Sequence, residues 1–296
     1  MNLKKYFSFI RHRLVAGCFI LTFGCASNAS AQMLIQYKFD EGSGTTAANS
    51  GSIGSSANLT IRPDAGTHLT WAAPASTAFG GGSALVSDGV ARGSQPGYIY
   101  GDGTGLNTGL SAFTMTMWVN LSSTTGTSAD RLLSFSGPGS VGTGGFQLQL
   151  NTTTPTTALT LNVDGSAVIS TANASVLGSW AFLAVTYDGT ATSNNVSFYS
   201  GTTTTSAAAL GSVRTLNKGA VDLITSPSQV LRIGNASDTN LDRSPAGMFD
   251  DVRVYSGVLN ASSVEAVRLA AVPEPSTMLF LAVGVAIVAG IRLRRC

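Results

Sequence analysis

The sequence predicts an all-β fold in which two antiparallel sheets pack into a sandwich. About a dozen short segments alternate apolar and polar residues with a period of two, and turn-forming residues separate them; 34 of the 296 residues are glycine. Only one stretch before residue 272 has the spacing of a helix, which excludes a parallel α/β sheet. With 44% hydrophobic and 11% charged residues, the chain is neither disordered nor a coiled coil.

The expected strands follow the chain in order. Residues 113–121 place Phe, two Met, Val and Leu on one face and two Thr, Trp and Asn on the other. Residues 180–187 are apolar on both faces, which predicts a central strand covered on both sides and buries Trp118 and Trp180. The other expected strands are 34–39, 84–86, 98–100, 131–135, 146–150, 159–163, 196–199, 230–233 and 248–255.

One helix is expected near residue 265. Ser262 and Glu265 have the spacing of a capping box, in which each side chain bonds a backbone N–H at the start of the helix. Val264, Val267 and Leu269 follow and supply an apolar face.

The first 31 residues predict a secretory signal peptide. A basic stretch precedes the apolar run 14–24, and the Ala29-x-Ala31 pair suits signal peptidase, which we expect to cut after Ala31. A lipid on Cys18 is excluded, because the apolar run follows that cysteine instead of preceding it. The three cysteines lie in this leader or at the last position, so the body, residues 32–272, must be stabilised by its core and not by disulfides.

Residues 278–291 predict a single short transmembrane helix. These fourteen apolar residues would span about 21 Å as a helix, whereas the hydrocarbon core of a bilayer is about 30 Å thick. Spanning therefore requires a locally thinned bilayer or arginines that snorkel. Arg292, Arg294 and Arg295 follow at once, and the positive-inside rule keeps them cytoplasmic and leaves the body outside.

Pro273, Glu274 and Pro275 precede this apolar run. A Pro-Glu-Pro motif, a short apolar helix and a terminal arginine cluster together resemble the PEP-CTERM sorting signal over residues 273–296. The resemblance implies processing near the motif by an exosortase, a membrane-embedded cysteine protease of bacteria that make exopolysaccharide. We then expect export across the inner membrane, transient anchoring, and a final location at the cell surface or in the extracellular matrix.

Four stretches of the body carry a second resemblance. Residues 37–44, 113–119, 179–189 and 249–259 resemble, in the same order, segments of laminin-G-like jelly rolls of the concanavalin A class, over roughly 35–270. The resemblance implies a jelly-roll domain over residues 32–272 and a module that binds glycans or proteins, often with calcium. It leaves open a structural or adhesive role in a biofilm matrix, and it leaves a glycosidase as a further alternative.

Catalysis is not expected from the titratable residues of the body. A glycosidase needs two carboxylates across the scissile bond, yet the body holds only two glutamates, Glu41 and Glu265. Asp250 and Asp251 are neighbours on an expected strand, so their side chains are predicted to point to opposite faces. His68 is the only histidine after the leader, which excludes a zinc cluster of histidines and cysteines.

Calcium is the only cofactor for which the sequence offers ligands. An EF-hand calcium loop over residues 238–249 is excluded. Arg243 stands where such a loop needs glycine, and Phe249 stands where it needs a bidentate glutamate. Aspartate and asparagine side chains also stabilise turns by accepting hydrogen bonds from backbone amides, and we favour this role over calcium binding. The calcium candidates are Asp88, Asp102, Asp238, Asn240 and Asp242.

Partners follow from the aromatic and charged residues. Trp71, Tyr98, Tyr100 and Tyr199 are candidates for a platform on which sugar rings stack. Between residues 32 and 272, ten Lys or Arg oppose fourteen Asp or Glu, so the body lacks the basic patch that a nucleic acid needs. The expected partners are signal peptidase, exosortase, the bacterial membrane and a polysaccharide.

Overall fold

The computed structural model describes residues 31–61, 69–73, 78, 82–89, 99–101, 106, 110–124, 129–136, 144–151, 157–221, 230–234 and 243–271. The leader with Ala29, the Pro-Glu-Pro motif, the apolar run 278–291 and the terminal arginines lie outside these ranges. The signal cleavage and the transmembrane helix therefore stay predictions. Among the described residues, none belongs to a helix with the length and apolar character needed to cross a bilayer.

The described residues form sixteen strands, one 3₁₀ turn and one α-helix. The elements are β1 (Gln32–Tyr37), β2 (Thr46–Ala47), η1 (Gly54–Ala57), β3 (Leu59–Ile61), β4 (Leu69–Trp71), β5 (Leu85–Asp88), β6 (Ile99–Gly101), β7 (Ala112–Ser123), β8 (Ala129–Ser136), β9 (Gly145–Asn151), β10 (Ala158–Val163), β11 (Ser166–Asn173), β12 (Ala181–Asp188), β13 (Val196–Thr202), β14 (Ala208–Ala209), β15 (Val230–Ile233), β16 (Ala246–Ser256) and α1 (Ala261–Ala271).

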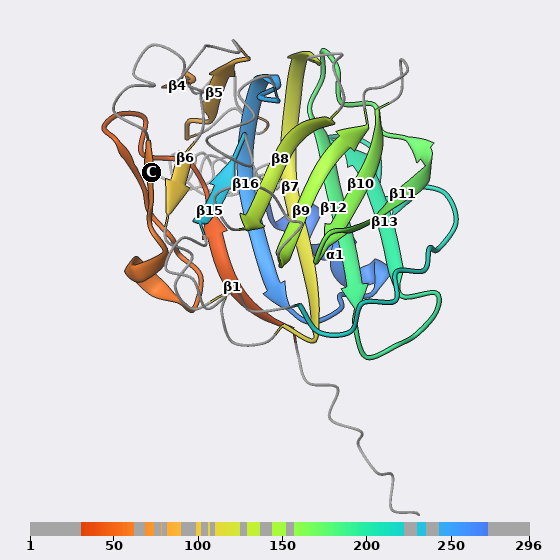
Figure 1. Cartoon of the computed structure of the whole chain (residues 1–296). Coiled ribbons are helices and arrows are strands. Elements are labelled where there is room, and N and C mark those ends of the chain that lie inside the picture. The colour runs from red at the N-terminus through yellow and green to blue at the C-terminus, as the bar shows by residue number, and fades with distance from the viewer. Residues whose placement is uncertain are drawn as a thin grey trace, which may run out of the picture. The chain divides into compact units, whose positions relative to one another are not determined.

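Two antiparallel sheets make up the fold, which confirms the predicted jelly-roll sandwich. Sheet A has the strand order β14-β13-β12-β7-β16-β5-β4, and β1 also pairs with β16. Sheet B has the order β11-β10-β9-β8-β15-β6-β3-β2. In Figure 1 the strands β8 to β11 lie in front of β7, β12 and β16, and α1 lies behind them.

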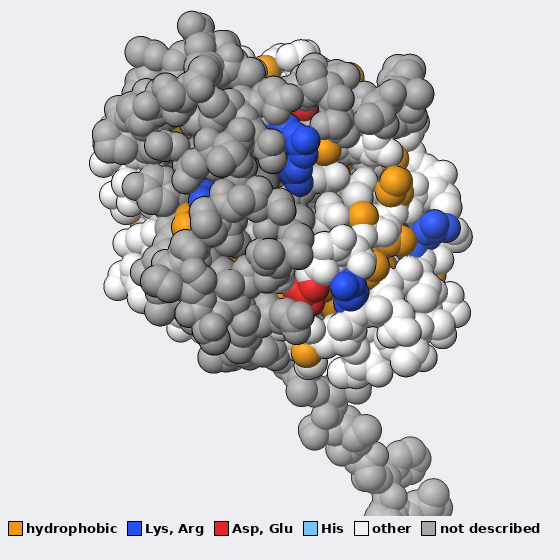
Figure 2. All heavy atoms as spheres, viewed as in Figure 1, with side chains coloured by type: hydrophobic (Ala, Val, Ile, Leu, Met, Phe, Trp, Pro, Cys, Tyr) orange, Lys and Arg blue, Asp and Glu red, His pale blue; other side chains and the backbone are white. Residues whose placement is uncertain are grey.

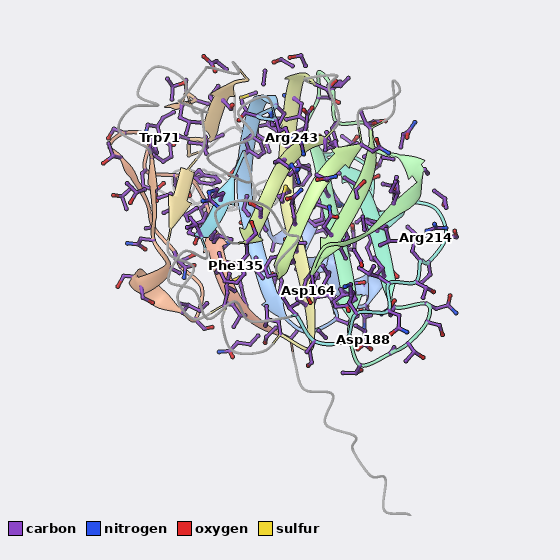
Figure 3. All side chains as sticks on the ribbon, in the orientation of Figure 1. Trp71, Phe135, Asp164, Asp188, Arg214 and Arg243 are labelled. Atoms are coloured by element: carbon purple, nitrogen blue, oxygen red, sulfur yellow. The ribbon has the colours of Figure 1, made fainter. Side chains whose placement is uncertain are left out.

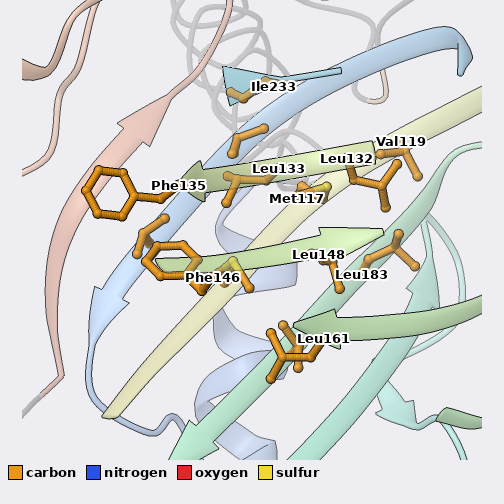
Figure 4. Close-up of a cluster of buried hydrophobic side chains, with 14 of the residues drawn as sticks. Met117, Val119, Leu132, Leu133, Phe135, Phe146, Leu148, Leu161, Leu183 and Ile233 are labelled. Carbon is orange, nitrogen blue, oxygen red and sulfur yellow. The ribbon is translucent and has the colours of Figure 1, made fainter. Parts of the chain in front are cut away.

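The core fills the space between the two sheets (Figure 4). The predicted alternation of β7 is confirmed, because Met115, Met117 and Val119 are fully buried on its inner face. Phe146 from β9 meets them from sheet B, and its ring centroid lies 4.8 Å from that of Phe113. Burial of apolar surface between the sheets is therefore the main stabilising interaction of the described body.

The outer face of sheet A is also covered where α1 packs against it. Trp118 of β7 and Phe182 of β12 are fully buried there, with ring centroids 5.5 Å apart. Val264 of α1 is buried against them, and Trp180 packs at the margin of this cluster. The prediction that β12 is covered on both faces is therefore confirmed.

The capping-box prediction for α1 is wrong. The side chain of Asn260, one residue before the helix, accepts the backbone N–H of Ser263 at 2.9 Å and so caps the helix. Glu265 lies two residues too far along to complete a box. Its carboxylate instead accepts two hydrogen bonds from Arg268, at 2.8 and 2.7 Å, and the backbone N–H of Ala207 at 2.7 Å. This pair ties α1 to sheet A.

Candidate functional site

A polar cavity of about 490 Å³ opens beside the C-terminal end of α1. Its walls come from β1, from β16 and from the last turn of the helix, so it lies on the outer face of sheet A next to the α1 cluster. Its volume falls in the range of small-molecule sites, about 300–1,000 Å³. The lining residues are Met33, Gln36, Lys38, Asp40, Gly82, Asp250, Asp251, Arg253, Ala270 and Ala271.

A bulge in β16 brings Asp250 and Asp251 to the same cavity, so the prediction that they face opposite sides is wrong. Asp250 pairs with Trp118 and Arg253 pairs with Thr116, so two residues of β16 stand opposite one of β7. Asp251 adopts φ +43°, in the left-handed region. The extra residue resets the alternation, which buries Val252 in the core and turns Arg253 outward.

Asp251 is held in a buried network of hydrogen bonds. Its Oδ1 accepts the Nε2–H of Gln36 and the Nε–H of Arg253, each at 2.9 Å. Its Oδ2 lies 2.7 Å from Nη2 of Arg253, which makes the ion pair bidentate. Burial alone would lower the pKa of Arg253, but the adjoining Asp251 carboxylate raises it overall. The charges of this pair are therefore mutually compensated.

Asp250 has a different environment from its neighbour. It is 5% exposed, and its carboxyl receives the backbone N–H groups of Asp251 and Ala78. Burial raises the pKa of Asp250 to about 8, with a further contribution from the charges of Asp251 and Asp40. Near neutral pH this carboxyl is therefore largely protonated, so it can donate a hydrogen bond as well as accept one.

The rim of the cavity is exposed and carries both signs of charge. Lys38 and Asp40 follow β1 and are exposed. Gly82 has φ +71°, and a Cβ built on it would come within 1.8 Å of Oδ1 of Asp40. Glycine at this position therefore gives Asp40 its place at the rim.

Few of the predicted calcium ligands fall in described residues. Asp88 ends β5 and is exposed, whereas Asp102, Asp238, Asn240 and Asp242 lie outside the described ranges. Within those ranges, no group of three or more His, Cys, Asp or Glu side chains is arranged to hold a metal ion, the cavity aspartates included. The calcium site stays a prediction.

The predicted aromatic platform is wrong for the two members whose side chains are described. Trp71 lies on β4 and Tyr199 on β13, which are five strand steps apart in sheet A, or about 24 Å. Figure 3 shows Trp71 far from Arg214, which bridges to Val196 of β13. Tyr199 is partly buried against the α1 cluster, and the Nε1–H of Trp71 donates to the carbonyl of Gly44 at 3.1 Å.

Charged side chains do not gather on the face shown in Figure 2. The described Lys and Arg side chains on that face stand in separate places, and one of them lies beside an acidic side chain. The absence of a basic patch on the body as a whole stays a prediction from composition.

The cavity residues were not identified from the sequence as a site. Their signal is a short charged run, Asp250, Asp251 and Arg253, inside a strand that is otherwise apolar and glycine-poor. Charged residues in the middle of a buried strand are uncommon unless they pair or bind something. The contribution of Gln36 has no such signal, because its side chain joins the network only through the pairing of β1 with β16.

Solved structures share the fold at low sequence identity. Domain 4 of AbnA, an extracellular arabinanase from Geobacillus stearothermophilus solved with arabinotriose, matches 80% of this chain over 98% of its own length, with 17% identity and a TM-score of 0.52. The binding domain of Paraclostridial Mosquitocidal Protein 1 matches 80% of this chain over 51% of its own length, with 12% identity and a TM-score of 0.53.

Two family models match the sequence, whereas a search of the curated proteins finds no relative. Residues 271–295 match the PEP-CTERM protein-sorting motif, which marks the chain for export to the cell surface or the extracellular space. Residues 92–265 match the second model. Because that match covers more than half of the chain, the protein belongs to the concanavalin A-like lectin/glucanase superfamily.

Proposed function

We propose that this protein is an exported, surface-sorted module that binds a glycan in the cavity between β1, β16 and α1, without catalysis. The observation that carries the proposal is the cavity itself, which combines buried hydrogen-bonding groups with access from solvent. The sorting motif supports a location where polysaccharide is the abundant ligand.

The lining of the cavity suits a sugar. Carboxyl, guanidinium and amide groups bond the hydroxyls of a pyranose from several directions, and Asp250, Arg253 and Gln36 supply one of each. Met33 and Ala270 add small apolar surfaces for the C–H faces of the ring. Domain 4 of the arabinanase was solved with a bound oligosaccharide, which favours a glycan over other ligands for this fold.

Binding to a glycan array tests the proposal. The exported protein is applied with calcium and with a chelator, and the Gln36→Leu variant is compared with Asp188→Asn, which changes an exposed turn outside the cavity. We expect at least one class of glycan to bind the wild type and the Asp188 variant, and the Gln36 variant to bind more weakly. No binding in either condition would contradict the proposal and favour a structural or adhesive role in the matrix.

Processing at both ends belongs to the same proposal. Signal peptidase would cut after Ala31, and an exosortase would act near Pro273-Glu274-Pro275 after transient anchoring in the membrane. The structural boundary supports the first cut, since β1 begins at Gln32. Mass spectrometry of the exported protein should give a chain that starts at residue 32 and ends near residue 275. A chain with both ends intact in the cytosol would contradict it.

A glycosidase is the second candidate, and one observation favours it. Asp250 and Asp251 line one cavity and have different electrostatic environments, which is how an acid and a base are set apart in many hydrolases. Against it, both oxygens of Asp251 are engaged by Arg253. Release of reducing sugar from polysaccharides by the wild type but not by Asp250→Asn would establish hydrolysis, and no release by the wild type would exclude it.

A further inference from the structure

We propose that the ligand of the cavity is an amino sugar whose free ammonium group binds between Asp250 and Asp40. This inference rests on the proposed glycan-binding function and names the class of sugar. It follows from how the charges of the cavity pair with one another.

Three carboxyl groups and two cations line the cavity, but the cations are unequally available. Arg253 is 8% exposed and is committed to Asp251 through two contacts, at 2.9 and 2.7 Å. Lys38 is exposed at the rim, where water screens its charge. Asp250 and Asp40 are therefore the carboxyl groups whose charge no buried cation compensates among the described residues.

Asp250 is the group that would gain most from a cationic ligand. It is 5% exposed and lines the cavity, and within the described part of the chain only backbone N–H groups bond to it. Ionising a buried carboxyl without a cation is costly, as its raised pKa shows. A ligand that brings its own positive charge would remove this cost.

An ammonium group on a sugar fits the site better than a bare metal ion. It carries three N–H donors, so it can bond Asp250 and Asp40 together and keep one for water. The cavity aspartates do not form a metal-holding group, whereas the cavity of about 490 Å³ accommodates an organic ligand. The amide of Gln36 and the apolar Met33 would then contact the ring.

The charged groups that face Asp250 predict proton release on binding. They are Asp251 and Arg253 on β16, and Lys38 and Asp40 after β1; the helix end contributes only alanines to the cavity. Because Asp250 is largely protonated at pH 7, an ammonium that stabilises its ionised form displaces the proton. A neutral sugar would leave the proton in place.

Calorimetry with matched ligands tests the inference. Glucosamine oligosaccharides and their fully N-acetylated counterparts of equal length are titrated into the exported protein at pH 7 in two buffers of different ionisation enthalpy. We expect the oligosaccharide with free amines to bind about tenfold or more tightly than its N-acetylated counterpart, because hydrogen bonds between charged groups are the stronger ones. Its binding should also release protons. Asp250→Asn should abolish this preference and the proton release, and Asp188→Asn should retain both.

The ligand pair keeps the test decisive even if a variant fails to fold. Equal affinity for the two oligosaccharides, or tight calcium binding that Asp250→Asn abolishes without any preference for the amine, would overturn the inference. Binding of neutral glycans alone would overturn it and leave the proposed function standing. Absence of binding to every glycan on the array would instead overturn the proposed function.

Discussion

The outer face of sheet A has two neighbouring regions, one on β7 and β12 and one on β1 and β16, that differ in how they are covered. At the α1 cluster, Trp118 and Phe182 are fully buried beneath the helix. One strand further, Asp250 stands directly beside Trp118 in the sheet, yet it lines a cavity open to solvent. The pairing of β7 with β12 is regular, whereas the pairing of β7 with β16 is interrupted by the bulge. Backbone register and side chains therefore together decide whether the face is covered or left as a site.

Each region also contains an arginine paired with a carboxylate, and the two pairs differ in burial. In the cavity, the side chains of Arg253 and Asp251 are 9% and 7% exposed. At α1, those of Arg268 and Glu265 are 5% and 24% exposed. Water reaches the second carboxylate more easily, so loss of its partner should cost less. The comparison can be tested by making the same change in both regions.

The largest loss of stability is expected at Trp118. Trp118→Ala should lower the free energy of unfolding by about 4 kcal/mol, because it removes a fully buried side chain and the surface on which α1 packs. Denaturant unfolding measures the loss. Leu269→Ala is the control, since Leu269 is 50% exposed on the same helix and should change stability by less than about 0.5 kcal/mol. Equal losses would mean that α1 does not dock as described.

The two ion pairs should respond unequally to the same substitution. Arg253→Met leaves Asp251 buried without its cation and should cost about 3 kcal/mol, whereas Arg268→Met should cost about 1 kcal/mol. Adding Asp251→Asn to the first variant should recover part of the loss, because the uncompensated charge is then removed. If the double variant is no more stable than the single one, lost packing and not charge explains the effect.

Asp250 should make stability fall as the pH rises. Its folded pKa of about 8 lies above the ordinary value near 3.9, so the folded state holds the proton more tightly than the unfolded chain. Its ionisation therefore costs nothing below about pH 4 and costs up to about 1.4 kcal/mol per pH unit between pH 4 and 8. Asp250→Asn should gain stability relative to the wild type across this window. If the unfolding free energies of the wild type and of Asp250→Asn changed with pH in parallel, the carboxyl of Asp250 would ionise as easily in the folded state as in the unfolded chain.

Glu265 should show the opposite sign and the smallest effect. The hydrogen bonds from Arg268 lower the pKa of Glu265, so its contribution to stability is present above the unfolded pKa and is lost as the pH falls through the folded value. Glu265→Gln should cost less than about 1 kcal/mol at pH 7, with a difference that closes in acid. If the difference in unfolding free energy between the wild type and Glu265→Gln grew in acid, the pKa of Glu265 would be raised and not lowered by its surroundings.

Much of the fold could be predicted from residue patterns. Every expected strand is present with small shifts at its ends, because alternation reports directly which face is buried. Five strands were not expected: β2, β3, β4 and β14 are only two or three residues long, and β11 buries only Val168 and Ser170. The helix was expected in the right place, but its cap was assigned to Ser262 instead of Asn260.

The cavity could not be predicted by the same reasoning. Strict alternation separates Asp250 from Asp251, and only the bulge between them and Arg253 turns both toward one side. Nothing in a single sequence marks that extra residue, because Asp251 is not a glycine and no turn residue follows it. The partner Gln36 lies more than two hundred positions away, so only the pairing of the two ends of the body reveals the site.

The extra residue of β16 gives the cavity a second carboxyl. Deleting one codon at Asp250 or Asp251 would restore regular alternation and leave Phe249, Val252 and Val254 in the core, with one aspartate still facing the cavity. A single-codon change can therefore alter the charge of the cavity while the interior is kept.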